Sequence, residues 1–265
     1  MTPTDKKYLN LLGKVLNEGE FVDDGRKRMF SLQNQIIEFE ETPLVTIRKT
    51  AWKTALREME WFLSGSTNLN NAHPSVHPWW EPWATESGDI RFSYGFQFNS
   101  PRFNQIDYLI KSLKENPKGR SNLITTWNTQ DMISAPIHNC HGTVIKARMG
   151  SEKGGLELTM IQRSADLLLG VPHNWIQYWA LGEWIVGMTN SYLRKFTWIG
   201  LDCHIYETHT ALAHRMARSR LAKVNNDPLP DLYQRENINI FKADNFTMDN
   251  PPSSPLFTER PELIV

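Results

Sequence analysis

The spacing of apolar residues predicts amphipathic helices in the first half of the chain. Apolar side chains recur at intervals of three and four positions within residues 5–18, 50–64 and 106–113, which is the repeat of one buried helical face. Gly65 is a suitable residue to end the second helix, because glycine readily adopts the left-handed conformation found after helices. Pro117 limits the third, because the residue before a proline disfavours the helical conformation.

Short apolar or alternating runs predict strands in the rest of the chain. These runs are QIIEFE at 35–40, SNLITTW at 121–127, GTVIKARM at 142–149, LELTMIQR at 156–163, FTWIGLDCHIY at 196–206 and NINIFKA at 237–243. The turn GSEKGG joins the third run to the fourth, and the fifth leads into a helix over residues 208–222. We expect loops at 21–30, which is charged, and at 70–93, a stretch long enough to carry a site.

The most apolar stretch, NWIQYWALGEWIVGMTN at 174–190, predicts a helix that is buried on nearly all sides and begins near Pro172. Gln177, Gly182 and Glu183 interrupt it, so it is too short and too polar to span a membrane. Helices and strands are mixed without a regular βαβ order. We therefore predict an α+β fold, in which helices on one face of a large sheet leave the other face free for a partner.

Composition narrows the classes of protein. The chain has 265 residues, of which 40% are hydrophobic, enough for one domain over 1–265 with a sizeable core. Basic and acidic residues both number 29, and no charged block runs along the chain, which argues against a broad nucleic-acid surface. Two cysteines cannot form a disulfide framework, and the first residues lack the apolar core of a signal peptide, so we expect a cytoplasmic protein.

A carboxylate stands on an apolar helical stripe. Glu58 falls on the same face of helix 50–64 as Ala55 and Phe62, where loss of hydration favours its neutral form. One interpretation is a carboxylate that a backbone or arginine partner satisfies. The other is a proton-handling acid that burial has tuned.

Cys140 lies between two histidines in APIHNCHGT and has three interpretations. A zinc site is disfavoured, because neither NCH at 139–141 nor DCH at 202–204 has the spacing that presents two ligands from one turn. A buried, inert thiol is the ordinary state of a lone cysteine. A nucleophile needs a depressed pKa and hence a nearby cation, for which Arg163 is the candidate.

Several separated motifs together resemble the thymidylate synthases. IQRSADLLLGVPHNWIQYWAL at 161–181 is similar to their QRS-x-D-x-x-LG-x-PFN segment, LDCHIYETH at 201–209 to their GD-x-H-x-Y-x-x-H, and CH at 140–141 to their catalytic PCH. EWFLSGSTN, WWEPWA and SYGFQF follow in the family's order. The resemblance runs from about Tyr8 to Phe246, and it identifies the chain as a member of the thymidylate synthase and pyrimidine hydroxymethylase superfamily.

The resemblance implies covalent catalysis on a pyrimidine nucleoside monophosphate. Cys140 would add as a thiolate to C6 of the base, and C5 would then attack the methylene group of methylenetetrahydrofolate. Glu58 would organise protons around the base, and Arg163 would serve both the thiolate and the phosphate. His141, Tyr94 and Asp166 complete the implied catalytic group. The implied fold is a three-layer α+β domain that dimerises through its sheet.

Other matches imply the ligands of the two substrates. For the nucleotide these are Arg26, Ser164, Asn174, Asp202, His204 and Tyr206, with Arg120 reaching the phosphate site of the partner subunit. For the folate they are Asp166, Trp80, Trp83, Leu169, Gly170 and His173. The two tryptophans have the alternative of being ordinary core residues. The resemblance implies no metal, no stable nucleic-acid partner and no membrane.

The sequence departs from the family's pattern near the pocket and at its end. DDGRKRMFS at 23–31 lacks the later glycines of DRTGTGT, Ser121 replaces the second of two arginines, and APIHNC at 135–140 replaces APC. His173 stands where a phenylalanine precedes the asparagine, and ERPELIV at 259–265 lacks the usual APVAI-like tail. Such departures resemble viral and biosynthetic hydroxymethylases, including those that serve phage DNA modification. The histidine and the tail are expected to admit water to the pocket.

We therefore predict hydroxymethylation of deoxyuridine monophosphate (dUMP) with methylenetetrahydrofolate and water. The Asn174 amide can accept from N3–H and donate to O4, which matches uracil, whereas a flipped amide supported by His141, His173 and Tyr94 would fit cytosine. The alternatives are reductive methylation of dUMP, methylation or hydroxymethylation of the cytosine nucleotide (dCMP), a nucleotide-binding regulatory module on the same fold, and a structural zinc protein.

Overall fold

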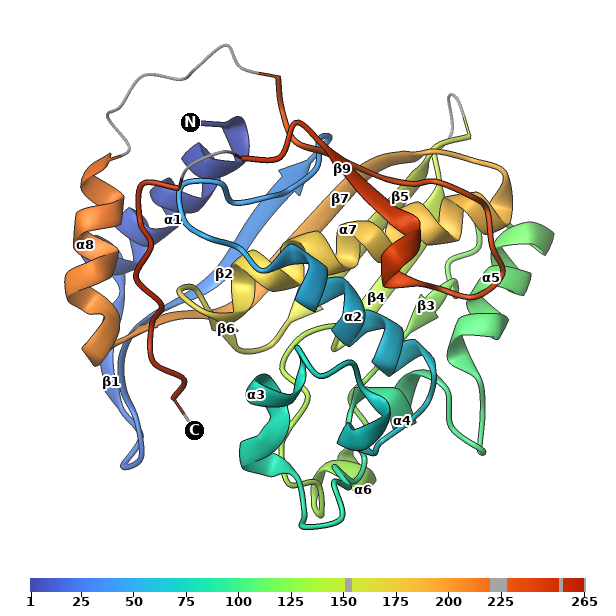
Figure 1. Ribbon diagram of the computed structural model, residues 1–265, viewed down its shortest axis with the longest axis horizontal. Helices are drawn as coiled ribbons and strands as arrows, with labels where there is room; N and C mark the ends of the chain where they lie inside the picture. Colours follow the sequence, from blue (N-terminus) through green and yellow to red (C-terminus); the bar gives the residue numbers. More distant parts are fainter. Residues whose placement is uncertain (151–153, 220–227, 253–254, 265) are drawn as a thin grey trace.

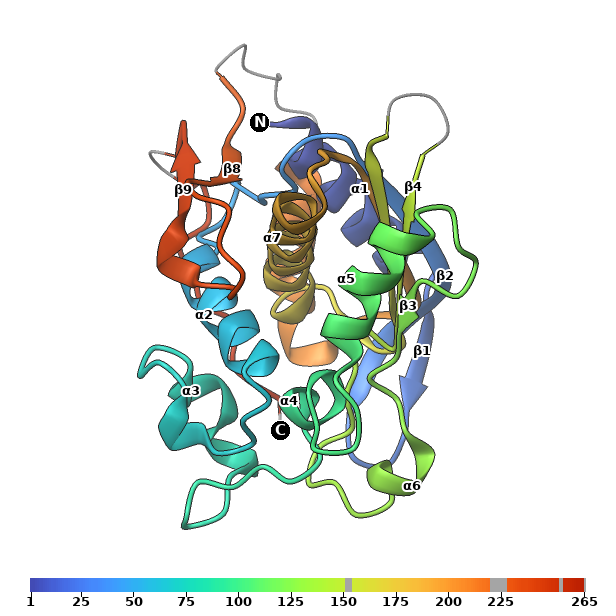
Figure 2. The same cartoon turned by 90° about the vertical axis from the view of Figure 1, so that its right-hand side faces the viewer.

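The computed structural model describes residues 1–150, 154–219, 228–252 and 255–264, and it arranges them in layers (Figures 1 and 2). A mixed sheet forms one layer, and the long helix α7 (Gly170–Thr189) lies against one face of it. Helix α2 (Trp52–Leu63) covers α7 from the side away from the sheet. The prediction of an α+β fold with a large sheet packed against helices is confirmed.

The main sheet contains seven strands in the order β1-β2-β7-β5-β4-β3, with β6 paired to β7. Their bounds are β1 Glu20–Asp23, β2 Arg28–Phe39, β3 Leu123–Ile124, β4 Val144–Met149, β5 Leu156–Gln162, β6 Ala165–Asp166 and β7 Leu193–Tyr206. Strands β5 and β6 run parallel to β7, and the other neighbours are antiparallel. A separate antiparallel pair, β8 (Asp231–Gln234) and β9 (Phe246–Asp249), lies beyond α7 (Figure 2).

The remaining helices surround α7 and the site. They are α1 Pro3–Glu18, α3 His77–Trp80, α4 Tyr94–Phe98, α5 Gln105–Glu115, α6 Thr129–Met132 and α8 Thr210–Arg218. Helix α1 begins with a capping box, in which Thr2 and Asp5 each accept the other's backbone N–H at 3.0 Å. In the described ranges, no helix is long and apolar enough to cross a membrane.

Helix α7 is the centre of the core, as its composition predicted. Trp175 and Tyr178 are fully buried, and Trp175 packs against Trp198 of β7 and Phe39 of β2. Burial on every side removes the amphipathic pattern, because each direction from the helix meets another element. The first turn of α7 therefore has a fixed place relative to the sheet, which matters for the side chains that it presents.

Three sequence-based predictions need correction. Residues 237–243 form no strand, because β8 and β9 pair with each other and leave this segment as their connection, with Ile240 66% exposed. The charged loop is shorter than 21–30, since most of it forms the β1–β2 hairpin. The strand at 121–127 is reduced to the two residues of β3 at the edge of the sheet. Part of the helix predicted at 208–222, and part of the turn GSEKGG, lie outside the described residues.

The side chains of β7 alternate between the two faces of the sheet, and this alternation shifts by one position near Gly200. Trp198 and Cys203 are both fully buried, although an odd number of positions separates them. A Cβ atom at Gly200 would lie 2.5 Å from Cys203 Sγ and from the Trp198 ring, so glycine is required there. Asn34, the position of β2 that falls between the pairs Gln33–Asp202 and Gln35–Gly200, has a positive φ of 56°. As a consequence Cys203 enters the core, and its neighbour His204 points to the opposite face.

Candidate active site

Cys140 lies in the loop after α6, where Tyr94 of α4 contacts both its thiol and its backbone. The Tyr94 hydroxyl lies 3.4 Å from Cys140 Sγ and accepts hydrogen bonds from the N–H groups of Cys140 at 2.7 Å and His141 at 3.1 Å. Phe62 stacks on the Tyr94 ring with 4.6 Å between centroids. The fold thus joins two candidate residues that are 46 positions apart in the sequence.

Arg163, at the end of β5, is the cation beside the thiol. Its backbone N–H donates to Cys140 O at 2.8 Å, and its guanidinium donates to the carbonyls of Asn139 at 2.9 Å and His138 at 3.0 Å. Burial nevertheless raises the pKa of the Cys140 thiol, and the Tyr94 hydrogen bond and the Arg163 charge lower it by less. A depressed pKa is therefore not observed. A thiol with a raised pKa keeps its proton at neutral pH, and that proton must leave when the sulfur attacks.

His141 is buried as a neutral residue beside the cysteine. Burial lowers its pKa to about 3, its ring stacks on Tyr94 at 4.3 Å, and its Nδ1 lies 3.0 Å from the Tyr178 hydroxyl. The next residue, Gly142, has a φ of 61°, and a Cβ there would lie 2.1 Å from the same hydroxyl. Glycine is required at this position because only it allows Tyr178 to come so close.

Glu58 is buried, as its place on the apolar stripe predicted. It is 6% exposed, and burial raises its pKa to about 7. Trp80 Nε1 donates to one carboxylate oxygen at 2.5 Å, and Gln177 Nε2 donates to the other at 2.8 Å; these bonds lower the pKa by less than burial raises it. A carboxyl group that titrates near neutrality can act as either acid or base at physiological pH.

Asn174, on the first turns of α7, belongs to the same buried network. Its Oδ1 accepts from Gln162 Nε2 at 3.0 Å, and its Nδ2 lies 3.5 Å from Gln177 Oε1. Gln162 Oε1 in turn accepts from Trp198 Nε1 at 3.0 Å. A continuous polar chain therefore runs from β7 to Glu58 on α2, through side chains of β5 and α7.

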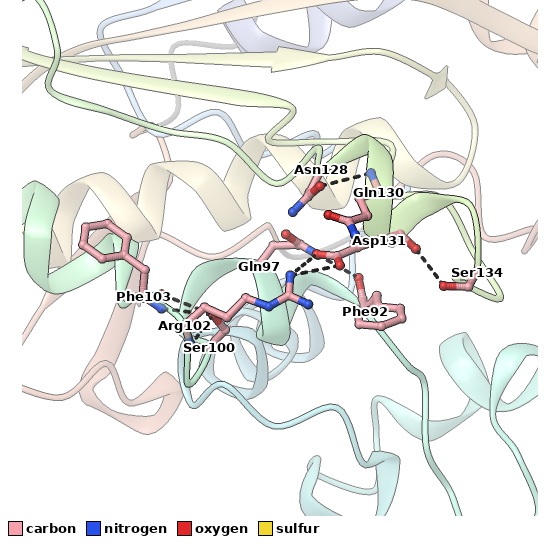
Figure 3. Close-up of polar contacts among 9 residues, drawn as sticks. All are labelled: Phe92, Gln97, Ser100, Arg102, Phe103, Asn128, Gln130, Asp131 and Ser134. Carbon is pink, nitrogen blue, oxygen red and sulfur yellow. Dashed lines mark hydrogen bonds and ion pairs between the residues drawn. The ribbon is translucent and has the colours of Figure 1, made fainter.

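The loop that carries Cys140 is anchored near α4 by a partly exposed ion pair. Arg102 donates to both carboxylate oxygens of Asp131, at 3.0 and 3.2 Å, and Gln97 Nε2 donates to the second at 3.2 Å (Figure 3). Asp131 is 3% exposed, although Arg102 is 59% exposed. Gln97 shares α4 with Tyr94, and Asp131 lies in α6 just before the cysteine loop. This contact therefore keeps Tyr94 in register with Cys140.

The residues expected to hold a phosphate are only partly assembled within one chain. Ser164 lies beside the cysteine, with its N–H 3.4 Å from Cys140 O. Arg26 is exposed in the β1–β2 turn, where Asp24 accepts its backbone N–H at 2.8 Å. Arg120 is exposed in the turn before β3, at the opposite edge of the sheet from β1.

The residues expected to hold a sugar lie together at the end of β7. Asp202 accepts a hydrogen bond of 2.5 Å from the Ser31 hydroxyl, and His204 and Tyr206 meet edge to face at 5.0 Å. Burial raises the pKa of Tyr206. His204 is 2% exposed, and within the described residues its Nε2 has no hydrogen-bond partner. A ligand hydroxyl would satisfy such a buried nitrogen.

The expected folate residues lie where α3, β6 and α7 meet. Asp166 Oδ1 accepts the N–H groups of Leu168 and Leu169, at 2.9 and 3.1 Å, and Leu169 and Gly170 are partly exposed. Trp80 is 5% exposed and directed at Glu58, so it is both a core residue and a polar neighbour of the site. Trp83 is partly exposed and packs edge to face on Trp80 at 6.0 Å.

His173 links α7 to the start of α2. Its Nδ1 donates to Leu169 O at 2.7 Å, and its Nε2 accepts the N–H of Ala51 at 3.1 Å. Burial lowers its pKa to about 4, and its ring lies 4.9 Å from that of Trp79. Both ring nitrogens are used by backbone groups. The expectation that this residue wets the pocket is therefore not supported by its contacts.

Sequence reasoning did not single out Gln162, Gln177 or Tyr178 as site residues. A signal for Gln177 existed, since it follows Asn174 by three positions on the same helical face and is polar within an apolar helix. The spacing of residues does not reveal that Gln177 contacts Glu58 on α2, or that Tyr178 contacts His141 in the cysteine loop, because both contacts join distant segments.

A cavity of about 530 Å³ is separate from this site. It lies on the other side of α2, where Arg57 pairs with Asp244 at 3.6 Å and Glu60 with Lys242 at 2.8 Å. Among the described residues, no group of three or more histidine, cysteine, aspartate or glutamate side chains is placed to hold a metal ion. The chemistry of the chain is concentrated around Cys140.

Comparisons with known proteins agree with this arrangement. The sequence profile of the family described as Thymidylate synthase matches residues 6–258. Thymidylate synthases from Coxiella burnetii strains Dugway 5J108-111 and RSA 493 / Nine Mile phase I are each 32% identical over 256 residues, which cover 91% of this chain and 95% of theirs. The structure of thermostable thymidylate synthase A from Bacillus subtilis matches with a TM-score of 0.83 and 26% identity, over 99% of each chain.

Proposed function

The chain belongs to the thymidylate synthase family, and from this premise we propose that it transfers a one-carbon unit from methylenetetrahydrofolate to C5 of dUMP. The observation that carries the proposal is the arrangement around Cys140. Its thiol lies beside the Tyr94 hydroxyl, the charge of Arg163 lowers the thiol pKa, and Glu58 of the Asn174–Gln177–Glu58 network is close enough to raise that pKa. Such an arrangement combines a nucleophile, a cation, an amide that can read a base edge and a carboxyl group that titrates near neutrality.

The nucleophilic step follows from the contacts of the cysteine. The Cys140 thiol releases its proton to water, Sγ as the thiolate forms a bond to C6 of the base, the electron pair of the C5–C6 double bond moves toward O4, and C5 becomes the nucleophile for the incoming carbon. Tyr94 positions the thiol through the two N–H groups that it accepts. Glu58, with a pKa of about 7, holds or releases a proton near the base as charge develops on it.

The folate fits the residues that face it. Asp166 uses Oδ1 for two backbone N–H groups, and Oδ2 takes neither of these bonds, so that oxygen is available to a pterin N–H. Leu169, Gly170 and Trp83 are partly exposed beside it and offer apolar contact. When bound, methylenetetrahydrofolate supplies the carbon and, for a methyl product, also the hydride.

The last step separates two products, and we propose hydroxymethylation. The support is the C-terminal tail, whose carbonyls at Ile264 and Glu262 accept from Lys27 at 3.4 Å and His209 at 3.0 Å, with Leu263 40% exposed. We propose that a tail bonded to Lys27 and His209 leaves the reacting carbon accessible to water. Reductive methylation is the second candidate. It is favoured by the contacts of His173, whose ring nitrogens are both bonded to backbone groups.

The proposal includes a homodimer formed through the outer face of the sheet. Apolar side chains are exposed on β1, β2 and β7 and at the β3 edge, namely Phe21, Ile36, Leu201 and Leu123. An exposed apolar surface of this kind is typical of a subunit interface. Pairing of two sheets would also bring Arg120 of one chain toward the phosphate site of its partner.

The experiment is a product assay. The protein is incubated with methylenetetrahydrofolate and, in separate reactions, with dUMP or dCMP, and the nucleotides are weighed by mass spectrometry. A hydroxymethyl group on dUMP with release of tetrahydrofolate is the expected result. A methyl group with release of dihydrofolate would identify reductive methylation instead. Lack of turnover on both nucleotides, with the Cys140→Ser variant indistinguishable from the parent, would refute an enzymatic role.

A further inference from the structure

The polar chain next to Asn174 has chemically defined ends. At one end, the Trp198 indole N–H can only donate, and it donates to Gln162 Oε1 at 3.0 Å. The carbonyl of Ser164 can only accept, and it accepts from Gln162 Nε2 at 3.1 Å. These two partners allow one orientation of the Gln162 amide, in which its NH₂ group faces Asn174.

The other neighbour of Asn174 is oriented in the same way. Gln177 Nε2 donates to the carbonyl of Ala55 at 3.1 Å and to Glu58 Oε2 at 2.8 Å. The carbonyl of Ala55 can only accept, so the NH₂ group of Gln177 must face it. Its Oε1 is therefore left on the side of Asn174. Gln162 and Gln177 are 1% and 0% exposed, so water does not compete for these bonds.

Asn174 consequently lies between a donor and an acceptor. Its Oδ1 faces the NH₂ group of Gln162 at 3.0 Å, and its Nδ2 faces Gln177 Oε1 at 3.5 Å. An amide oxygen has two lone pairs and an amide nitrogen two hydrogens. One of each is used in the chain, and one of each remains for a ligand.

We propose that Gln177 and Trp198 are positioning residues that determine the choice of base, by holding the Asn174 amide in the orientation that matches uracil and mismatches cytosine. The inference rests on the proposed function, in which Asn174 reads the pyrimidine edge. In the held orientation Oδ1 accepts from uracil N3–H and Nδ2 donates to uracil O4. Cytosine presents an acceptor at N3 and an amino donor at C4, and it needs the amide reversed.

Reversal of the Asn174 amide is costly because the other hydrogen bonds of Gln162 and Gln177 hold each of these side chains in one orientation. It would place Asn174 Nδ2 against Gln162 Nε2, two donors about 3 Å apart, and Asn174 Oδ1 against Gln177 Oε1, two acceptors. Neither glutamine can turn to compensate, since each would lose its own bonds to Trp198 or Glu58. Uracil specificity is in this way a property of the whole chain of side chains and not of Asn174 alone.

The test compares kcat/KM for dUMP and dCMP in the full-length protein and in two variants. Gln177→Met keeps the length of the side chain but cannot accept from Asn174. Trp198→Phe keeps a ring in the core but cannot donate to Gln162. Each is expected to lower the dUMP-to-dCMP ratio by about tenfold or more, since each weakens one of the two contacts that oppose reversal of the Asn174 amide. Gln177→Met alone should also move the pH dependence of turnover upward, because it removes a bond that lowers the Glu58 pKa.

The control is Gln97→Met. It removes a buried glutamine that donates to Asp131 beside the cysteine loop but takes no part in the polar chain of side chains around Asn174. A general loss of packing lowers activity on both nucleotides together, so this variant should retain the parental ratio. An unchanged ratio in both Gln177→Met and Trp198→Phe, with dUMP still converted, would overturn the inference and leave the proposed function intact. A parent protein that turns over neither nucleotide would refute the proposed function itself.

Discussion

Replacing Glu58 by glutamine should remove a pH-dependent loss of stability. In the folded chain, burial raises the Glu58 pKa to about 7, whereas an unfolded glutamate titrates near 4.5. Between these two values the unfolded chain has released a proton that the folded chain retains. Proton release therefore favours unfolding as the pH rises. Glu58 makes its full contribution to the free energy of unfolding below pH 4.5, and this contribution is lost by about pH 7. Glutamine has no such proton.

The magnitude follows from the width of that window. Each pH unit over which the folded chain holds the additional proton costs about 1.4 kcal/mol. From 4.5 to about 7, the parent should lose about 3 kcal/mol of unfolding free energy that Glu58→Gln does not lose. The amide will itself meet a donor, from Trp80 or Gln177, at a cost of about 1–3 kcal/mol. That cost is the same at every pH, so it cancels in the slope.

The assay is urea denaturation followed by tryptophan fluorescence at a series of pH values from 4.5 to 8, at one protein concentration. Glu58→Gln should show a flatter dependence of unfolding free energy on pH than the parent, irrespective of which is more stable at pH 5. Glu60→Gln, which removes a partly exposed carboxylate of the same helix, is the control and should follow the parent. Parallel profiles of Glu58→Gln and the parent would refute the argument that burial holds a proton on Glu58.

Four other predictions address the site. Cys140→Ser should abolish turnover and any covalent nucleotide adduct seen by mass spectrometry, whereas Cys203→Ser, at a fully buried core position, should retain both. Tyr94→Phe should lower kcat about tenfold or more and raise the pH at which iodoacetamide alkylates Cys140, because the hydroxyl lowers the thiol pKa. Dimers mixed from Arg120→Ala and Cys140→Ala chains should regain activity that neither parent dimer has; none at all would count against a shared phosphate site. Asn174→Asp should gain activity on dCMP, and its failure to do so in product assays would show that the base is chosen elsewhere.

Periodicity alone anticipated much of the framework. The apolar repeats at 5–18, 50–64 and 106–113 correspond to α1, α2 and α5, and the burial of Glu58 followed from its position on the second of them. Local patterns succeed here because a helix shows its buried face directly in the spacing of its residues. The run at 237–243 failed for the complementary reason, since β propensity does not form a strand without a partner, and the neighbouring β8 and β9 pair with each other.

The candidate site divides in the same way. The resemblance to the family indicated Cys140, Arg163 and Asn174 as candidate residues. It supplied a candidate cation, but it could not show how burial, hydrogen bonds and charge combine to set the thiol pKa. Only the packed structure shows that burial raises the thiol pKa by more than Arg163 lowers it. It likewise shows that His173 spends both ring nitrogens on backbone groups, so a departure that suggested an open pocket is a link between α7 and α2.

The sequence by itself determined which side chains are available and which helices and strands carry them, because these depend on residue type and on intervals of a few positions. The tertiary structure alone decided which side chains meet. Gln177 reaches Glu58 across 119 positions and Trp198 reaches Gln162 across 36, and these contacts orient the amide between them. Hydrogen bonding is short-ranged and directional, so the chemistry of this site depends on distances that no spacing along the chain encodes.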